Sequence, residues 1–326
     1  MKCYNKTLNY NLIMAQVKSN ITFIIFTYNE KKRIEYPIKC FLPYGEVIVS
    51  DDSSTDNTVK IAQKLGAKVL KRKVHGAGFV ENKEEVEFIF SHVKTDWVFW
   101  GFADDMAPKT CLELYKKISQ ENKYKIVVQK RKTLMYDGKS ELHPGLISTK
   151  FFREDSLDFS DNTIHQMGKF APHVQPAEVL YLPPIDEYAT YHFSLETTES
   201  LMSKINLYST TQAKSTQGRI SLIKLISAPL IIFIETYFFN GSWKYGIKGY
   251  ISSMRFAMGY FVTLSKKYEM DNNITLSSME KKFTKEKKKL LLFSPRSNIF
   301  KKIWAYLLIF FLSRLHKKYK FGKKKS

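Results

Sequence analysis

The sequence predicts an α/β fold in which a mostly parallel sheet is covered by helices on both faces. Two short runs of apolar, β-branched residues, 21–27 and 46–50, have the composition of strands that are buried on both sides. Residues 54–67 follow the second run and have the cap residues, apolar spacing and terminal glycine of a helix. Strands and helices that alternate at this spacing indicate right-handed crossovers and therefore parallel strands.

The remaining elements continue this alternation to about residue 110, and beyond it the pattern is looser. We expect helices at 31–42, 79–92 and 111–120, strands at 68–72 and 97–102, and a strand or hairpin arm at 124–136. Residues 137–190 show little periodicity, which favours an irregular, substrate-binding loop system.

The C-terminal part is predicted to be helical and to lie at a membrane surface. A helix is expected at 197–213, and two apolar stretches follow at 222–239 and 303–312. Spanning a bilayer takes about 20 largely apolar residues, and charges or Pro229 interrupt the first stretch while the second is too short. Amphipathic helices in the membrane interface explain both stretches. The alternatives are a buried core helix or a true span at 222–239, with a solvated tail.

The charge is concentrated at the C-terminal end. Of the formal net charge of +21, residues 281–326 contribute sixteen Lys and Arg against one acidic residue. We expect an anionic membrane surface as partner and no nucleic acid, because the aromatic residues of this tail are not interleaved with basic ones. The three cysteines have no disulfide or metal spacing, and the N-terminus lacks a long apolar run. Both favour the cytoplasmic side of a membrane.

Three expected strand ends carry polar clusters, in the sequences TYNE, SDDSSTD and ADD. Carboxyl ends of parallel strands share one edge of a sheet, where ligands bind. Such residues are also ordinary turn residues, but their occurrence at three successive strand ends favours a site. The sequence has no glycine-rich phosphate loop after the first strand. Carboxylates would bind a diphosphate through a hard cation, so we predict a nucleotide diphosphate bridged by Mg²⁺ or Mn²⁺.

These segments resemble the family 2 glycosyltransferases. The residues that carry the resemblance are ITFIIFTYNE, EVIVSDDSSTDNTVKIAQKLGAKVLKR and DWVFWGFADD, and the segments downstream are similar to bacterial lipopolysaccharide inner-core β-glycosyltransferases. The resemblance spans about 20–269 and implies a GT-A, Rossmann-like fold. It divides the chain into an N-terminal extension (1–20), a GT-A catalytic domain (21–195), a membrane-associating helical region (196–270) and a basic tail with a short apolar helix (271–326).

The resemblance also implies functional residues. A nucleotide-sugar would be bound by Thr27, Asn29, Glu30, Asp51, Asp52, Asn82 and Asp104. Asp51 would contact the base, and Asp104 would hold the metal. The base that deprotonates the acceptor would be Asp161 or Asp105, with His165 in contact with the acceptor.

The resemblance implies an inverting transfer of a sugar from a nucleotide-sugar, expected to be a UDP-sugar. The acceptor would be a lipid-linked or lipopolysaccharide-core glycan at the cytoplasmic membrane face. Three residues depart from the family pattern: Phe102 replaces an acid, Glu81 a basic residue and Gln166 a glutamate. They leave open a catalytically silent paralogue that binds a nucleotide-sugar or a partner without turnover.

Overall fold

The computed structural model describes most of the chain, namely residues 19–72, 80–135, 137–142, 146–160, 162, 167–194, 197–292 and 298–320. For residues 315–320 it describes the backbone alone. The chain forms two compact units, Met1–Tyr268 and Glu269–Ser326. Each unit is described by itself.

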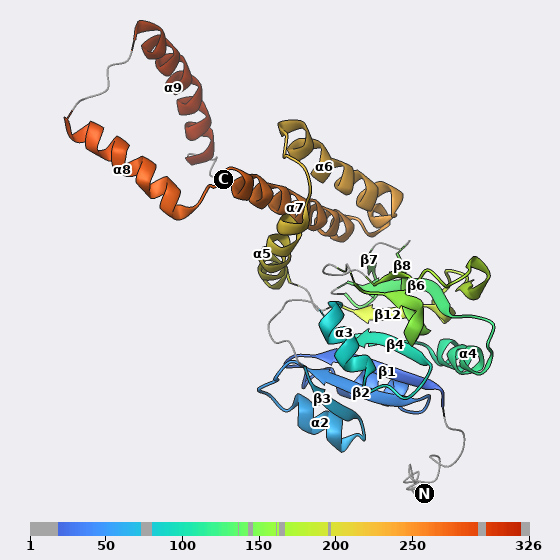
Figure 1. Cartoon of the computed structure of the whole chain (residues 1–326). Coiled ribbons are helices and arrows are strands. Elements are labelled where there is room, and N and C mark those ends of the chain that lie inside the picture. Colours follow the sequence, from blue (N-terminus) through green and yellow to red (C-terminus); the bar gives the residue numbers. More distant parts are fainter. Residues whose placement is uncertain are drawn as a thin grey trace, which may run out of the picture. The chain divides into compact units, whose positions relative to one another are not determined.

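The first unit is built on a mixed sheet in which ten strands pair within the described residues (Figure 1). The four strands of the N-terminal half are parallel, in the order β3-β2-β1-β4. They are β1 (Ile21–Thr27), β2 (Glu46–Asp51), β3 (Lys68–Lys71) and β4 (Trp97–Phe102). This part confirms the predicted α/β fold, because the carboxyl ends of all four strands lie at one edge.

The second half of the sheet contains antiparallel strands. Strand β8 (Ile147–Arg153) lies between β4 and β6 (Ile126–Leu134) and is antiparallel to both. Strand β12 (Thr190–Phe193) is parallel to β6 and antiparallel to β5 (Asp105–Met106). Strands β7 (Glu141–Leu142) and β11 (Val179–Tyr181) also pair with β6, and β9 (Leu157–Asp158) pairs with β10 (Lys169–Phe170) in a separate sheet.

The prediction that 137–190 is irregular is therefore wrong for β8, which is a central strand. Its fully buried pair Phe151 and Phe152 packs on opposite faces of the sheet. Short 3₁₀ helices connect the remaining strands of this region, at Glu154–Ser156, Pro176–Glu178 and Asp186–Tyr188.

Helices cover both faces of the sheet, as predicted. Successive residues of β1 alternate between the faces: Phe23 packs in one apolar cluster with α1 (Glu35–Phe41), α2 (Thr58–Lys64) and α4 (Lys109–Gln120). Ile24 packs in the other with α3 (Lys83–Phe90). This continuous burial explains why β1 is an uninterrupted apolar run.

Helices α1, α2 and α3 begin later than their sequence patterns predict, and for α2 and α3 the cause is local. Helix α2 begins at Thr58 because Ser53 has a left-handed backbone (φ 60°) and the Asp56 carboxylate accepts a hydrogen bond from the Thr58 N–H. Helix α3 begins at Lys83 because the Asn82 side chain caps it, accepting from the Glu85 N–H at 2.9 Å. The polar residues before each helix are thus left at the sheet edge.

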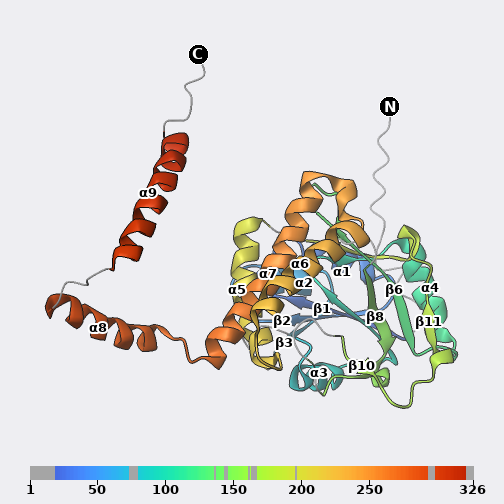
Figure 2. The ribbon, with the colours of Figure 1, turned by 90° about the horizontal axis from the view of Figure 1, so that it is seen from above.

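Three helices complete the first unit and lie side by side in both views (Figure 1, Figure 2). They are α5 (Thr198–Ser215), α6 (Leu222–Ile234), which continues as a π-helix over Glu235–Phe239, and α7 (Ile247–Asp271), preceded by a 3₁₀ turn at Ser242–Tyr245. Lys266 of α7 donates to Asn206 of α5, and Phe233 of α6 packs on Tyr250 of α7. An ion pair of Lys248 with Asp137 ties α7 to the turn after β6.

The second unit contains two described helices, α8 (Leu276–Leu292) and α9 (Ile299–Lys320). The apolar stretch predicted at 303–312 is the middle of α9, which is longer than the ten residues of the pattern. Helix α8 is rich in lysine and has no buried residue.

Candidate active site

Two acids and a histidine meet at the edge of the sheet where the parallel strands end. Asp104 and Asp105 follow β4, and His192 lies in β12. The His192 Nδ1 atom is 3.3 Å from Asp104 Oδ1 and 3.1 Å from Asp105 Oδ1. One ligand atom from each residue lies within 4.8 Å of the others, so the three residues could hold a metal ion.

Asp105 is completely buried. Its carboxylate accepts from the Phe102 N–H at 2.9 Å and from the Lys150 ammonium. Burial raises the pKa of Asp105, but Lys150 and His192 outweigh this effect and hold the pKa well below its usual value. The carboxylate is therefore ionised, and each of its two oxygens has a hydrogen-bond partner. This burial argues against the prediction of Asp105 as the base, because neither oxygen is open to an acceptor.

Lys150 reaches Asp105 from an irregular point of β8. Val127 of β6 pairs with Phe151 of β8, and Gln129 pairs with Ser148. One residue of β6 but two residues of β8 lie between these pairs, so β8 has one extra residue at this point. Such a β-bulge bends a strand and redirects its side chains. The buried Lys150 ammonium also lies 5.1 Å from the centre of the Phe102 ring. Burial lowers the pKa of Lys150, and the Asp105 charge opposes this shift.

His192 is the residue of this cluster that the sequence patterns did not identify. Burial lowers its pKa, but the hydrogen bonds to Asp104 and Asp105 raise it above the usual value. The available signal was a fourth strand end with a polar residue, in the sequence TYHF. That strand, Thr190–Phe193, begins at the last residue of the region expected to be irregular, and no strand was predicted there.

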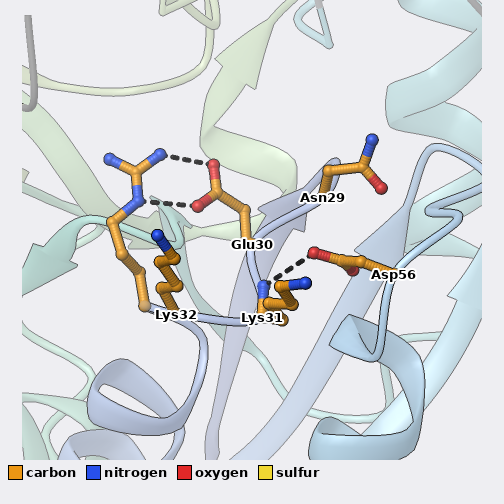
Figure 3. Close-up of a pocket in the computed structure, with 6 residues that line it drawn as sticks. Asn29, Glu30, Lys31, Lys32 and Asp56 are labelled. Carbon is orange, nitrogen blue, oxygen red and sulfur yellow. Dashed lines mark hydrogen bonds and ion pairs between the residues drawn. The ribbon is translucent and has the colours of Figure 1, made fainter.

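Arg33 joins the end of β1 to the acidic cluster. Its Nε and Nη2 atoms donate to the two carboxylate oxygens of Glu30 at 2.6 and 2.5 Å, and Nη1 donates to Asp104 Oδ2 at 3.3 Å. A cavity of about 320 Å³ adjoins this contact and is lined by Asn29, Glu30, Lys31, Lys32, Arg33 and Asp56. Figure 3 shows the Lys31 N–H bonded to the Asp56 carboxylate at one side of this cavity.

The predicted residues at the ends of β1 and β2 form one hydrogen-bonded unit. The buried Asp51 carboxylate accepts from the Thr27 hydroxyl at 2.9 Å and from the N–H and hydroxyl of Ser54 at 2.8 and 2.6 Å. Asn29 has a left-handed backbone (φ 56°), and its side-chain oxygen accepts from the Thr55 N–H. The two strand ends are therefore fixed against each other.

A buried arginine after β3 is another residue that the sequence patterns missed. Arg72 Nη1 lies 3.2 Å from Asp52, and Arg72 Nε lies 3.5 Å from the fully buried Glu85. The Arg72 Nη2 atom is buried and has no hydrogen-bond partner within the described part of the chain. Arg72 thus positions Asp52 below the strand ends.

Two of the residues that depart from the family pattern, Phe102 and Glu81, pack within the sheet domain. Phe102 packs on Phe26, with ring centres 5.6 Å apart. Glu81 is buried, and this burial raises its pKa. The predicted residues Asp161 and His165, and the departing Gln166, lie outside the described residues.

Comparison with known proteins identifies the kind of enzyme. An uncharacterized glycosyltransferase of Rickettsia bellii (strain RML369-C) is 31% identical over 269 residues, which cover 77% of this chain and 86% of the relative. One of Rickettsia conorii is 30% identical over 76% of this chain and 89% of the relative. The protein is therefore a glycosyltransferase. A family model described as glycosyl transferase family 2 matches residues 22–174, so the chain belongs to glycosyltransferase family 2, as the resemblance predicted.

More distant similarities are shorter or weaker. A lipopolysaccharide core biosynthesis glycosyltransferase, LpsC of Rhizobium meliloti, is 36% identical over 81 residues, which are 24% of this chain and 30% of that protein. The structure of S. aureus TarS with UDP-GlcNAc covers 78% of this chain and 91% of its own at 15% identity, with a TM-score of 0.41. The family assignment does not depend on this similarity, because it rests on the sequence relatives and the family model.

Proposed function

We propose that the enzyme transfers a sugar, with inversion, from a UDP-sugar to a lipid-linked or lipopolysaccharide-core glycan at the cytoplasmic face of a membrane. The observation that carries this proposal is the cluster of Asp104, Asp105 and His192 beside the Asp51 unit, at the carboxyl ends of the parallel strands. Open α/β sheets bind their ligands at this edge.

The donor would bind along the ends of β1, β2 and β4. In this proposal Thr27, Asn29, Asp51 and Asp52 form the nucleoside side of the site, and Glu30, Asn82 and Asp104 lie on the side of the phosphates and the sugar. The exposed ring of Tyr28 is available to stack on the base. The Asn82 side chain already caps α3, so its contribution would be to place the end of that helix toward the donor.

The chemistry of the acidic cluster fits a divalent cation. Carboxylate oxygens such as those of Asp104 suit a hard cation, Mg²⁺ or Mn²⁺. Asp104, whose carboxylate lies between His192 and Arg33, would hold the ion. A bound cation would offset the charge that develops on the leaving diphosphate. Asp105 would hold His192 Nδ1 from the buried side and so keep the imidazole beside Asp104.

The transfer needs a base on the acceptor side. We assign this role to Asp161, with His165 as a contact to the acceptor. The base takes the proton from the acceptor hydroxyl, and that oxygen attacks the anomeric carbon opposite the diphosphate. The new glycosidic bond forms as the bond to the diphosphate breaks, so the configuration inverts.

The helical layer supports a membrane location. Within the described residues, Leu222–Phe239 is the one stretch long and apolar enough to cross a membrane, and 6% of it is buried. Leu222, Ile223, Ile226 and Leu230 are exposed along α6. Exposed apolar side chains that adjoin one another along a helix indicate a surface that binds a partner. Because Lys224 and Pro229 interrupt the stretch, we favour a helix that lies in the interface of an anionic membrane over one that spans it.

The decisive experiment compares the full-length protein with Asp104→Asn. Nucleoside diphosphate sugars are tested with membrane extract and Mn²⁺ or Mg²⁺, and sugar transfer is measured. Mutation of residues that only support a metal ligand costs about 10- to 100-fold in metal affinity or activity, so we expect Asp104→Asn to lower transfer at least about 100-fold. Asp155→Asn is the matched control, because this side chain is 62% exposed. Absence of transfer from every donor would disprove the proposal.

The second candidate is a catalytically silent protein that keeps the donor site. It is favoured by the packing of Phe102 on Phe26 and by the buried Glu81, since both remove polar contacts from the site. In that case the wild type and Asp104→Asn would show the same background in the transfer assay. Nucleotide binding by the wild type would persist.

A further inference from the structure

Arg33 is held in place by the chain around it. Its backbone N–H donates to the Glu30 carbonyl oxygen at 2.8 Å, which closes a turn after β1. The Glu30 N–H donates to the Thr58 hydroxyl at 2.7 Å, and the next residue, Ile34, is fully buried. The position of the Arg33 side chain is therefore set before any ligand binds, which lowers the entropic cost of binding.

The Arg33 guanidinium still has hydrogen-bonding capacity. Of its five N–H donors, two go to Glu30 and one goes to Asp104. One N–H on Nη1 and one on Nη2 remain, and the side chain is 28% exposed next to the cavity of Figure 3. A planar pair of N–H groups of this kind suits phosphate oxygens better than a lysine ammonium does.

The charges around Arg33 also suit an anion, provided that a cation is bound first. Three carboxylates, those of Glu30, Asp104 and Asp105, face the two cations Arg33 and Lys150. These five groups carry a net negative charge, and a divalent ion on Asp104 would make the net charge positive. At the cavity, the exposed Lys31 and Lys32 add two positive charges and Asp56 adds one negative charge. The loaded site is therefore attractive to a diphosphate.

We propose that Arg33, anchored by Glu30 and Asp104, is a ligand of the donor's diphosphate and a determinant of donor affinity. This assignment rests on the proposed function and names a contact on the phosphate side of the same site. Arg33 joins the nucleotide end of the sheet edge to the acidic cluster, so a diphosphate bound to a cation on Asp104 would lie within its reach.

The test measures binding, so that it does not depend on turnover. Uridine and UDP are titrated calorimetrically, each with Mn²⁺, into the full-length wild type, Arg33→Gln and Arg33→Lys. A charged hydrogen bond of this kind corresponds to about a tenfold change in affinity or more. We expect Arg33→Gln to weaken UDP binding at least about tenfold and to leave uridine binding unchanged. Arg33→Lys should give an intermediate UDP affinity, because lysine keeps the positive charge but lacks the planar pair of N–H donors.

Arg219→Gln is the control, because Arg219 is exposed and lies outside the sheet. Circular dichroism and melting temperature show whether each variant folds. UDP affinity of Arg33→Gln within about twofold of the wild type, or an equal loss for uridine and UDP, would overturn the assignment of Arg33 alone. If the wild type binds neither UDP nor GDP or ADP with Mn²⁺, the proposed donor site fails, and the assignment of Arg33 fails with it.

Discussion

Lys150 and Asp105 form an ion pair in the interior, where both side chains are almost completely withdrawn from water. A buried charge that loses its partner is strongly destabilising, by about 3 to 5 kcal/mol. We expect Lys150→Met to lower the free energy of unfolding by about this amount, measured by equilibrium denaturation in urea. The double variant Lys150→Met/Asp105→Asn should recover part of the loss, because neither charge then remains buried alone.

Lys117→Met serves as the control for this pair, because Lys117 is exposed on α4. Equal unfolding free energies for Lys150→Met and Lys117→Met would contradict a stabilising role for the buried pair. The double variant also separates stability from function. If it regains stability but not Mn²⁺ affinity, the charge of Asp105 is needed for the metal site itself.

The sequence allowed prediction of those site residues whose signal is local. Asp51 and Asp104 directly follow apolar strands, so the rule for the ends of parallel strands identified them. His192 and Lys150 contact Asp105 across 87 and 45 residues of chain. No short pattern reports such a contact. It depends on the pairing of β5 with β12 and on the bulge in β8.

The strands also differ in how clearly the local sequence marks them. Strands β1, β2 and β4 are buried on both faces, so each has a continuous apolar run that marks it in the sequence. Strand β8 begins exposed and becomes buried only at Lys150, Phe151 and Phe152. This gives it neither a continuous run nor a regular alternation. Its place between β4 and β6 follows from tertiary pairing, which the sequence pattern does not report.

Helix α6 is the element that most clearly tests the membrane proposal. Ile226 and Leu230 are 60% and 54% exposed and lie one turn apart. We expect Ile226→Glu/Leu230→Glu to reduce cosedimentation with vesicles that contain anionic lipid, because burying charged groups in the interface is unfavourable. Ile185→Glu is the control, since Ile185 is 45% exposed on the sheet domain. Equal binding of the double variant and the control would contradict insertion of α6.

The charge distribution of the whole molecule makes a separate prediction. Lys281, Lys285 and Lys288 lie on one side of α8, at helical spacing. Each basic residue near an anionic membrane contributes about 1 kcal/mol. Replacing all three by Gln should therefore weaken binding to anionic vesicles by up to about 100-fold. Binding to zwitterionic vesicles should not change. A loss of the same size on both kinds of vesicle would show that the effect is not electrostatic.

The bulge in β8 makes the site depend on the length of the chain as well as on the identity of its residues. Thr149 and Lys150 together stand opposite Val128, where a regular ladder would have one residue. A strand shifted by a single position turns its side chains to the other face. When relatives of this enzyme are aligned, a lysine one position away in this strand is therefore not the equivalent of Lys150. The alignment has to place the extra residue before it can say which relatives share the buried ion pair.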